Sequence, residues 1–307
     1  MRVFITGASG FVGSFFLKLI LSSGKHDVAV LLKNPESVWR IKDCLQQTTI
    51  IKGDLTDLPP LEKEVKAFKP DAFVHLAWNG VMGSNRNDVN QWRNVPQALH
   101  LVEMASQVGA MHWVGLGSQA EYGQCQDKVN ESTVTNPTTL YGVSKLAACN
   151  LANRLCKEIG IRFAWLRLFS SYGPTDNPGW MIPYVIDSLL AGRKPRLTSA
   201  EQLWDYIYVE DAATSIAAVL DSDKAEGIFN LGSGKAFKLR TVIEMIRDRI
   251  DPSLPLGFGE IPYRTDQVMC LEADITRLKK LTGWIPKVGI EEGLDKTIRW
   301  RMMREIW

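Results

Sequence analysis

Short apolar runs alternate with longer amphipathic segments along the first half of the chain. Residues 2–6 (RVFIT) form the first apolar run, and residues 10–24 carry apolar side chains at helical spacing and end at a glycine. Because strands that alternate with helices form parallel sheets covered on both faces, the pattern predicts an α/β fold with a doubly wound, Rossmann-type parallel sheet. Further strands are expected at 27–32, 48–54, 71–77, 111–118 and 161–169, and further helices near 60–68, 89–108 and 140–159.

The regular alternation ends after residue 174. Prolines interrupt the chain there, and helical periodicity returns near 183–191 and 239–250. No segment is repeated and none is of low complexity. We therefore expect a smaller C-terminal lobe that interleaves with the first domain. The predicted division is residues 1–174 for the Rossmann domain, with segments near 204–234 returning to it, and 175–307 mainly for the smaller lobe.

Composition and charge exclude several classes of protein. The 36 basic and 34 acidic residues leave a formal net charge of +2, and no basic stretch interleaves with aromatic residues, so no nucleic-acid partner is expected. No apolar run approaches the roughly 20 residues of a membrane span, and the N-terminus leads directly into a strand. The five cysteines form no CxxC pair, which favours buried thiols in a reducing cytoplasm and no metal site. We therefore expect a soluble cytoplasmic protein.

A glycine-rich loop joins the first predicted strand to the first predicted helix. The stretch TGASGFVG places Gly7, Gly10 and Gly13 in this loop. Glycines there permit a tight turn, a close approach of a pyrophosphate to backbone N–H groups, and close packing of the helix on the strand. The N-terminus of the helix adds partial positive charge. A flexible loop is the alternative, but the position between strand and helix favours a dinucleotide-binding site.

Tyr141 and Lys145 stand four residues apart at the start of the helix expected at 140–159. Side chains at i and i+4 lie on one face of a helix. A cation beside a phenol lowers a pKa that is ordinarily about 10, which makes tyrosine usable as an acid or base. Such a pair by itself is often structural. Here Ser118 ends a predicted strand, and strand ends line the ligand crevice of a doubly wound sheet, so we expect Ser118 and Tyr141 to meet there.

These motifs together resemble the extended short-chain dehydrogenase/reductase family, and within it the nucleotide-sugar epimerases, dehydratases and reductases. The resemblance extends over nearly the whole chain. The motifs that carry it are TGASGFVG, Asp54-Leu55, HLA at 75–77, Asn94-Val95, Ser118, Tyr122-Gly123, Tyr141-xxx-Lys145, LRLFSSYGP (166–174), WDYIYVEDAA (204–213), FNLGSG (229–234), Arg264 and LTGWIP (281–286).

The resemblance implies a catalytic set of Ser118, Tyr141 and Lys145. Tyr141 would exchange the proton on the sugar oxygen, and Ser118 would hydrogen-bond the reacting carbonyl. Lys145 would hold the nicotinamide ribose and lower the pKa of Tyr141. The resemblance also implies that residues 1–174 bind NAD(P). The residues expected to bind it are Gly7, Ser9, Gly10, Phe11, Val12, Gly13, Asp54, Leu55, Leu76, Ala77, Asn94, Tyr141 and Lys145, with Asn94 also orienting the active-site helix.

The end of the second predicted strand bears on the choice of cofactor. An acidic residue there accepts hydrogen bonds from the ribose 2′-hydroxyl and repels a 2′-phosphate, whereas cationic groups do the opposite. This chain has Lys33 and Asn34 at the strand end and Arg40 close behind. We therefore expect NADP(H) to be favoured, with NAD(H) possible. A Lys33 that only points to solvent is the alternative.

The residues after Ser118 bear on the reaction. Sugar 4,6-dehydratases of the family carry an Asp-Glu pair there, because the elimination of water needs a second acid and base. This chain has Gln119 and Ala120, and neither side chain titrates. Glu121 is one position later, and a strand-end residue shifted by one points elsewhere. Dehydration is therefore not expected.

The expected substrate contacts depart from the family pattern in two places. Trp204 stands where many relatives have an arginine, and Ser170 stands where many have an asparagine. Arg264 matches the phosphate-binding arginine of the family, and an arginine can grip a phosphate through two parallel hydrogen bonds. The residues expected to bind the nucleotide sugar are Trp78, Ser118, Gln119, Ser170, Gln202, Trp204 and Arg264, with Met82 another candidate for the sugar pocket.

The sequence therefore predicts an NADP(H)-dependent reductase that acts at C4 of a nucleotide-linked 4-keto hexose, with a 6-deoxyhexose favoured and Tyr141 as proton donor. An NAD-dependent nucleotide-sugar 4-epimerase is the alternative within the family. A non-catalytic NADP-sensing regulatory module is the alternative from another class. We also expect a homodimer in which the helices at 89–108 and 140–159 pair, because both carry apolar residues on more than one face. Those residues include Leu99, Val102, Met104, Leu146, Leu151 and Leu155.

Overall fold

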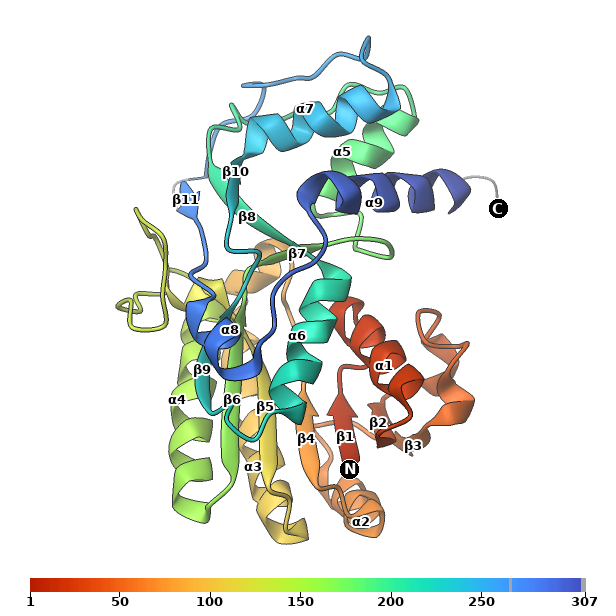
Figure 1. Ribbon diagram of the computed structural model, residues 1–307, viewed down its shortest axis with the longest axis vertical. Coiled ribbons are helices and arrows are strands. Elements are labelled where there is room, and N and C mark those ends of the chain that lie inside the picture. The colour runs from red at the N-terminus through yellow and green to blue at the C-terminus, as the bar shows by residue number, and fades with distance from the viewer. Residues whose placement is uncertain (265–266, 305–307) are drawn as a thin grey trace.

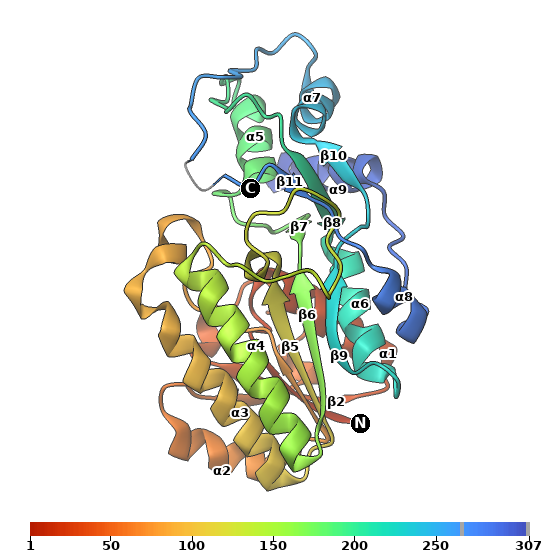
Figure 2. The same ribbon diagram turned by 90° about the vertical axis from the view of Figure 1, so that its left-hand side faces the viewer.

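The computed structural model describes residues 1–264 and 267–304, and its centre is a seven-stranded parallel sheet (Figures 1 and 2). The strand order is β3-β2-β1-β4-β5-β6-β9, and every pairing within it is parallel. The predicted doubly wound α/β fold is therefore confirmed. The strands are β1 (Arg2–Thr6), β2 (Asp27–Leu32), β3 (Thr49–Lys52), β4 (Ala72–His75), β5 (His112–Ser118), β6 (Arg162–Leu168) and β9 (Gly227–Leu231).

Helices cover both faces of this sheet. Apolar side chains of α1 and α6 pack on one face, and those of α2, α3 and α4 pack on the other. Figure 2 shows the second layer in front of the strands. Most strand residues are consequently buried on both sides, which explains why the strands read as short continuous apolar runs. The helices are α1 (Phe11–Ser23), α2 (Leu58–Phe68), α3 (Asn94–Val108), α4 (Leu140–Ile159) and α6 (Val209–Asp221).

A smaller lobe lies beyond the carboxyl ends of the large sheet (Figure 1). In its sheet, β8 pairs with β7, β10 and β11, and its helices α5, α7 and α9 enclose a separate apolar core. The chain passes between the lobes, because β8 belongs to the small sheet while α6 and β9 return to the large one. The elements of this part are β7 (Ser170–Tyr172), α5 (Met181–Leu190), β8 (Leu203–Tyr208), β10 (Ala236–Lys238), α7 (Leu239–Ile250), β11 (Cys270–Leu271), α8 (Thr276–Thr282) and α9 (Ile290–Arg304).

The helix predicted at 89–108 is divided in the structure. A 3₁₀ turn, η4 (Val89–Arg93), comes first, and α3 begins at Asn94. Asp88 caps η4, because its side chain accepts a hydrogen bond from the Asn90 N–H at 2.7 Å. The remaining 3₁₀ turns are η1 (Pro35–Ser37), η2 (Leu45–Gln47), η3 (Gly83–Asn87) and η5 (Gln119–Glu121). No helix of the described chain is long and apolar enough to cross a membrane.

Candidate active site

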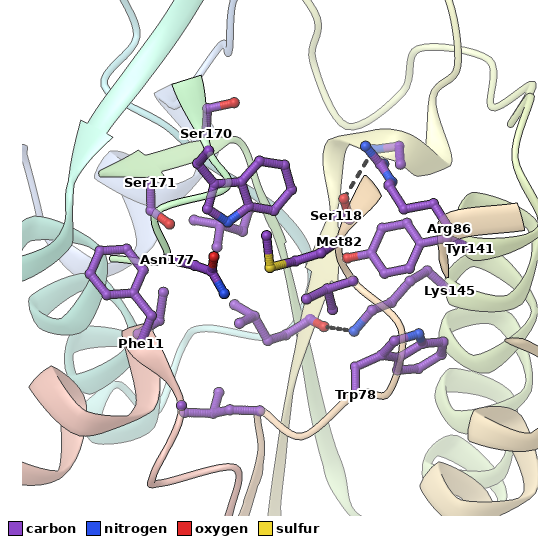
Figure 3. A pocket seen from close by; sticks show the side chains of 18 of the residues that line it. Phe11, Trp78, Met82, Arg86, Ser118, Tyr141, Lys145, Ser170, Ser171 and Asn177 are labelled. Carbon is purple, nitrogen blue, oxygen red and sulfur yellow. Dashed lines mark hydrogen bonds between the residues drawn. The ribbon is translucent and has the colours of Figure 1, made fainter. Parts of the chain in front are cut away.

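A cavity of about 860 Å³ lies at the carboxyl edge of the large sheet and reaches the smaller lobe (Figure 3). The strand order reverses between β1 and β4, and the crevice at such a reversal is the usual ligand site of an open α/β sheet. All but two of the residues expected to bind cofactor or substrate or to act in catalysis line this one cavity. The exceptions are Asn34 and Asn94.

The glycine loop forms one wall of the cavity. Gly7 has φ +80°, and a Cβ atom there would lie 2.5 Å from the backbone nitrogen of Ala77. A Cβ on Gly13 would lie 2.1 Å from the carbonyl oxygen of Gly7. No side-chain cap satisfies the N-terminus of α1 at Gly10. The loop therefore leaves a cradle of bare backbone at a helix N-terminus, which fits the diphosphate of a dinucleotide.

Charged side chains lie where β2 and β3 end. Lys33 Nζ is 2.6 Å from Asp54 Oδ2, and this hydrogen-bonded pairing lowers the pKa of Asp54. Arg40 donates from Nε and Nη2 to the carbonyl oxygen of Thr175, at 3.2 and 2.9 Å. Asn34 does not line the cavity, because its side chain caps the η1 turn by accepting from the Glu36 N–H. The expected cofactor contact of Asn34 stays a prediction.

Ser118 and Tyr141 meet as expected. Ser118 is the last residue of β5, and Tyr141 is the second residue of α4, whose N-cap Thr139 accepts from the Gly142 N–H. The Ser118 hydroxyl accepts from the Ala120 N–H at 3.2 Å, and both hydroxyl side chains line the cavity. Burial raises the pKa of Tyr141, whereas the neighbouring Ser118 hydroxyl and the charge of Arg86 lower it. A strand end and a helix start far apart in the sequence thus bring two hydroxyls together.

Lys145 lies on the same face of α4 as Tyr141, as the spacing predicts, but its ammonium contacts other groups. Nζ donates to the carbonyl oxygen of Leu116 at 2.6 Å and lies 3.8 Å from the ring centroid of Trp78. The centroid of the Tyr141 ring is 6.0 Å away. Burial lowers the pKa of Lys145 to about 7. Here Arg86, and not Lys145, supplies the charge that opposes the rise in the pKa of Tyr141.

Glu121 is turned away from the cavity, as its shifted position predicts. Its carboxylate is fully buried and accepts from the Ser118 N–H at 2.8 Å, from Trp165 Nε1 at 2.9 Å and from Arg167 Nε at 2.8 Å. All of these contacts hold β5, β6 and η5 together. Glu121 therefore makes structural contacts, and the two residues between it and Ser118, Gln119 and Ala120, have no titratable side chain.

The expected substrate residues lie toward the smaller lobe. Trp204 on β8 donates from Nε1 to the hydroxyl of Ser170 at 2.6 Å, so the two departures from the family pattern contact each other. Asp205, the next residue, is turned away and accepts from the backbone of Ser233, Gly234 and Ala273. The lining on this side includes Trp78, Met82, Gln119, Ser170, Gln202, Trp204 and Arg264.

Asn94 is buried beneath the cavity wall and does not reach the cavity. Its amide oxygen accepts from the Asn79 N–H at 2.9 Å, and its Nδ2 donates to the Gln91 carbonyl at 3.0 Å. The expected cofactor contact of Asn94 stays a prediction. Its hydrogen bonds hold the segment that follows Trp78.

Several lining residues were not found by sequence reasoning. Arg86 comes from η3, and its guanidinium carbon lies 4.8 Å from the centroid of the Tyr141 ring. Asp176 and Asn177 come from the loop after β7, and burial raises the pKa of Asp176 to about 7. These residues stand in irregular segments, so no periodicity marks them. Among the described residues, no group of three or more His, Cys, Asp or Glu side chains is arranged to hold a metal ion.

Comparison with known families agrees with this geometry. Residues 3–232 match the NAD-dependent epimerase/dehydratase family, a match that covers both the glycine loop and the Ser118–Tyr141 pair. The chain belongs to this family. The expected resemblance to nucleotide-sugar enzymes of the extended short-chain dehydrogenase/reductase type is confirmed.

Individual members of the family are similar over nearly the whole chain. A UDP-glucose 4-epimerase of Corynebacterium glutamicum is 27% identical over 94% of this chain and 91% of its own length. A dTDP-glucose 4,6-dehydratase of Escherichia coli is 25% identical over 100% of this chain and 94% of its own. A solved structure of Thermus thermophilus UDP-glucose 4-epimerase in complex with NAD is 26% identical, with a TM-score of 0.88 and coverage of 98% and 99% of the two chains.

Proposed function

We propose that this protein is a nucleotide-sugar 4-epimerase that works with a nicotinamide dinucleotide. The Ser118 and Tyr141 hydroxyls, in one cavity with the glycine cradle, carry the proposal. The structural role of Glu121 argues against the dehydratase reaction. Similar proteins named UDP-glucose 4-epimerase favour this reaction over the reductase expected from sequence. A non-catalytic module would have no need of the pair.

Each part of the cavity has a role in this proposal. The glycine loop and the N-terminus of α1 would hold the diphosphate of the dinucleotide, and Lys145 would hold its nicotinamide ribose. The bound nicotinamide would supply hydride acceptance and return at C4. Tyr141 would remove and return the proton on the sugar O4 while Ser118 hydrogen-bonds the same oxygen. The nucleotide would lie toward the smaller lobe, with its diphosphate at Arg264.

A second candidate is the net reduction of a nucleotide-linked 4-keto-6-deoxyhexose with NADPH. The observation that favours it is Lys33, which lines the cavity where an acidic residue would favour the ribose of NAD. Both candidates use Tyr141 and Ser118 in the same way. They differ in whether the cofactor leaves after one hydride transfer.

One experiment separates the candidates. Purified protein would be incubated with UDP-glucose or UDP-galactose, with and without NAD, and in parallel with 4-keto-6-deoxy nucleotide sugars and NADPH or NADH. Absorbance at the nicotinamide band and NMR of the product report turnover and the configuration at C4. Interconversion of the UDP-sugars supports the epimerase, and oxidation of NADPH with a single product supports the reductase. Absence of both reactions across UDP-, dTDP-, CDP- and GDP-sugars would contradict a catalytic role.

Cofactor preference should depend on the charges at the ends of β2 and β3. If Lys33 and Arg40 contact a 2′-phosphate, changing both to alanine should weaken NADPH binding by roughly tenfold or more per lost contact and leave NADH binding nearly unchanged. Lys42, an exposed lysine of the same segment, is the control for general charge. Binding would be measured by fluorescence titration. An equal loss for both cofactors would mean that Lys33 and Arg40 act only through their contacts with Asp54 and Thr175.

We propose a homodimer formed through α3 and α4. Val143 and Leu151 on α4 are 47% and 48% exposed, whereas Val102 and Met104 belong to the core and do not contribute. Burying an apolar surface across a two-fold axis would exclude these side chains from water. Sedimentation should therefore show a dimer that Val143→Asp together with Leu151→Asp converts to a monomer. Val134→Asp, at an exposed position outside both helices, is the control, and a monomeric unmodified protein at micromolar concentration would contradict the proposal.

A further inference from the structure

The wall of the cavity next to Tyr141 contains a cation that sequence motifs do not mark. Arg86 lies in the η3 turn, lines the cavity, and has its guanidinium carbon 4.8 Å from the centroid of the Tyr141 ring. In Figure 3 Tyr141 lies between Arg86 and Lys145. We propose that Arg86 is a positioning residue of the active site, whose charge stabilises the ionised form of Tyr141 and so sets the pH range of its proton transfer. The proposal deepens the proposed function and rests on it, since it concerns the same hydroxyl.

Hydrogen bonds on both sides of Arg86 fasten the η3 turn, one to η4 and one to α4. Gln91 Nε2 donates to the carbonyl oxygen of Asn85 at 2.8 Å, on one side of Arg86. On the other side, Asn87 Oδ1 accepts from the backbone N–H of Leu140 at 3.1 Å. Leu140 is the first residue of α4 and directly precedes Tyr141. The turn that carries Arg86 is thus fastened to the first residue of the helix that carries the phenol.

Gln91 connects the turn to the opposite side of Tyr141 as well. Its Oε1 accepts from Trp78 Nε1 at 3.0 Å, and its Nε2 also donates to the Gly80 carbonyl at 2.6 Å. The Trp78 ring packs edge-on against Tyr141, with centroids 6.2 Å apart. A Cβ on Gly80 would lie 2.5 Å from Gln91 Nε2, so only glycine leaves room for this amide. One buried side chain therefore positions both the aromatic neighbour of Tyr141 and the turn that carries Arg86.

Arg86 provides a more constant charge than Lys145. Burial lowers the pKa of Lys145 to about 7, so its ammonium is partly neutral at neutral pH. A guanidinium stays protonated throughout the pH range in which proteins are folded. Burial and the charge of Glu121 raise the pKa of Tyr141, and the neighbouring Ser118 hydroxyl lowers it. Arg86 is therefore the fixed positive charge beside the phenol, and it lowers the pKa that burial raises.

The test is a titration of Tyr141 that needs no substrate. In protein labelled at the tyrosine ζ carbon, the Tyr141 resonance is the one that Tyr141→Phe removes. We expect its titration midpoint to move to higher pH in the neutral variants Arg86→Met and Arg86→Gln, and to return close to that of the unmodified protein in Arg86→Lys. Arg93→Met removes another arginine that lies over an aromatic ring, Trp92, outside the cavity, and should move nothing. Unchanged midpoints in both neutral Arg86 variants would overturn the proposal.

Kinetics give a second measurement. In the direction in which Tyr141 accepts a proton, kcat of Arg86→Met should fall by about tenfold or more at neutral pH and recover at higher pH, because a nearby opposite charge typically shifts a pKa by a unit or more. KM should change much less than kcat. A loss of rate that no rise in pH restores would contradict the electrostatic role. Because the titration uses the protein without substrate, failure of the proposed reaction and failure of this inference are distinguishable.

Discussion

Tyr141→Phe is expected to slow the chemical step by about 10²–10⁴, the usual contribution of a positioned general acid or base. The variant keeps the ring that packs against Trp78 and loses only the hydroxyl. Cofactor affinity should therefore remain nearly unchanged. Single-turnover measurements with the substrate identified by the panel above would report the step, and fluorescence titration would report NAD(H) and NADPH binding.

The neighbouring residues should respond differently. Ser118→Ala should slow the chemistry by removing one hydrogen bond from the reacting oxygen. Lys145→Ala should impair both cofactor binding and rate, because its ammonium would serve the ribose. Tyr184→Phe, in the smaller lobe and outside the cavity lining, should retain full activity. Full turnover in Tyr141→Phe would mean that the pair at 141 and 145 is structural and would remove the enzymatic interpretation.

Glu121→Gln should lower the free energy of unfolding by about 3–5 kcal/mol, the range for breaking one partner out of a buried ion pair. The substitution conserves shape but leaves the buried guanidinium of Arg167 without its counter-charge, and it can place an amide donor opposite Arg167 Nε. Denaturant unfolding followed by circular dichroism would measure the change.

A surface glutamate is the control that separates the loss of the buried ion pair from the loss of a carboxylate in general. Glu158 pairs with Arg154 on the exposed side of α4, and Glu158→Gln should stay within about 0.5 kcal/mol. If Glu121→Gln were as stable as the unmodified protein yet inactive, Glu121 would belong to the chemistry, and the argument against a dehydratase would no longer hold.

Local patterns were enough to predict the fold class and the centre of the site. The loop after β1 needs glycine because a Cβ at Gly7 or Gly13 would clash with backbone atoms. The eight-residue motif TGASGFVG is enough to reveal this requirement. Tyr141 and Lys145 share a face because helical geometry places i and i+4 together. Ser118 could be assigned to a strand end because its preceding residues form an apolar run. Each of these rules relates residues that are close in sequence.

The surroundings of these residues depended on contacts between distant segments. Lys33 faces Asp54 because β2 and β3 are parallel neighbours with Leu32 opposite Lys52, a register that the two segments do not reveal separately. The long segment between β4 and α3 has no periodicity that places Arg86 against Tyr141. Gln91 belongs to no motif of the sequence analysis, yet it is 3% exposed and holds two parts of the site.

The sequence alone therefore determined most of the strands and helices of the Rossmann domain and which chemical groups stand at their ends, because propensity, periodicity and helix geometry act over a few residues. Only the tertiary structure decided the electrostatic environment of those groups. Burial raises the pKa of Tyr141 and lowers that of Lys145, and Arg86 stands beside the phenol. The pKa of a buried group depends on every segment that packs around it and on every charge nearby. No single stretch of the chain contains all of these contributions.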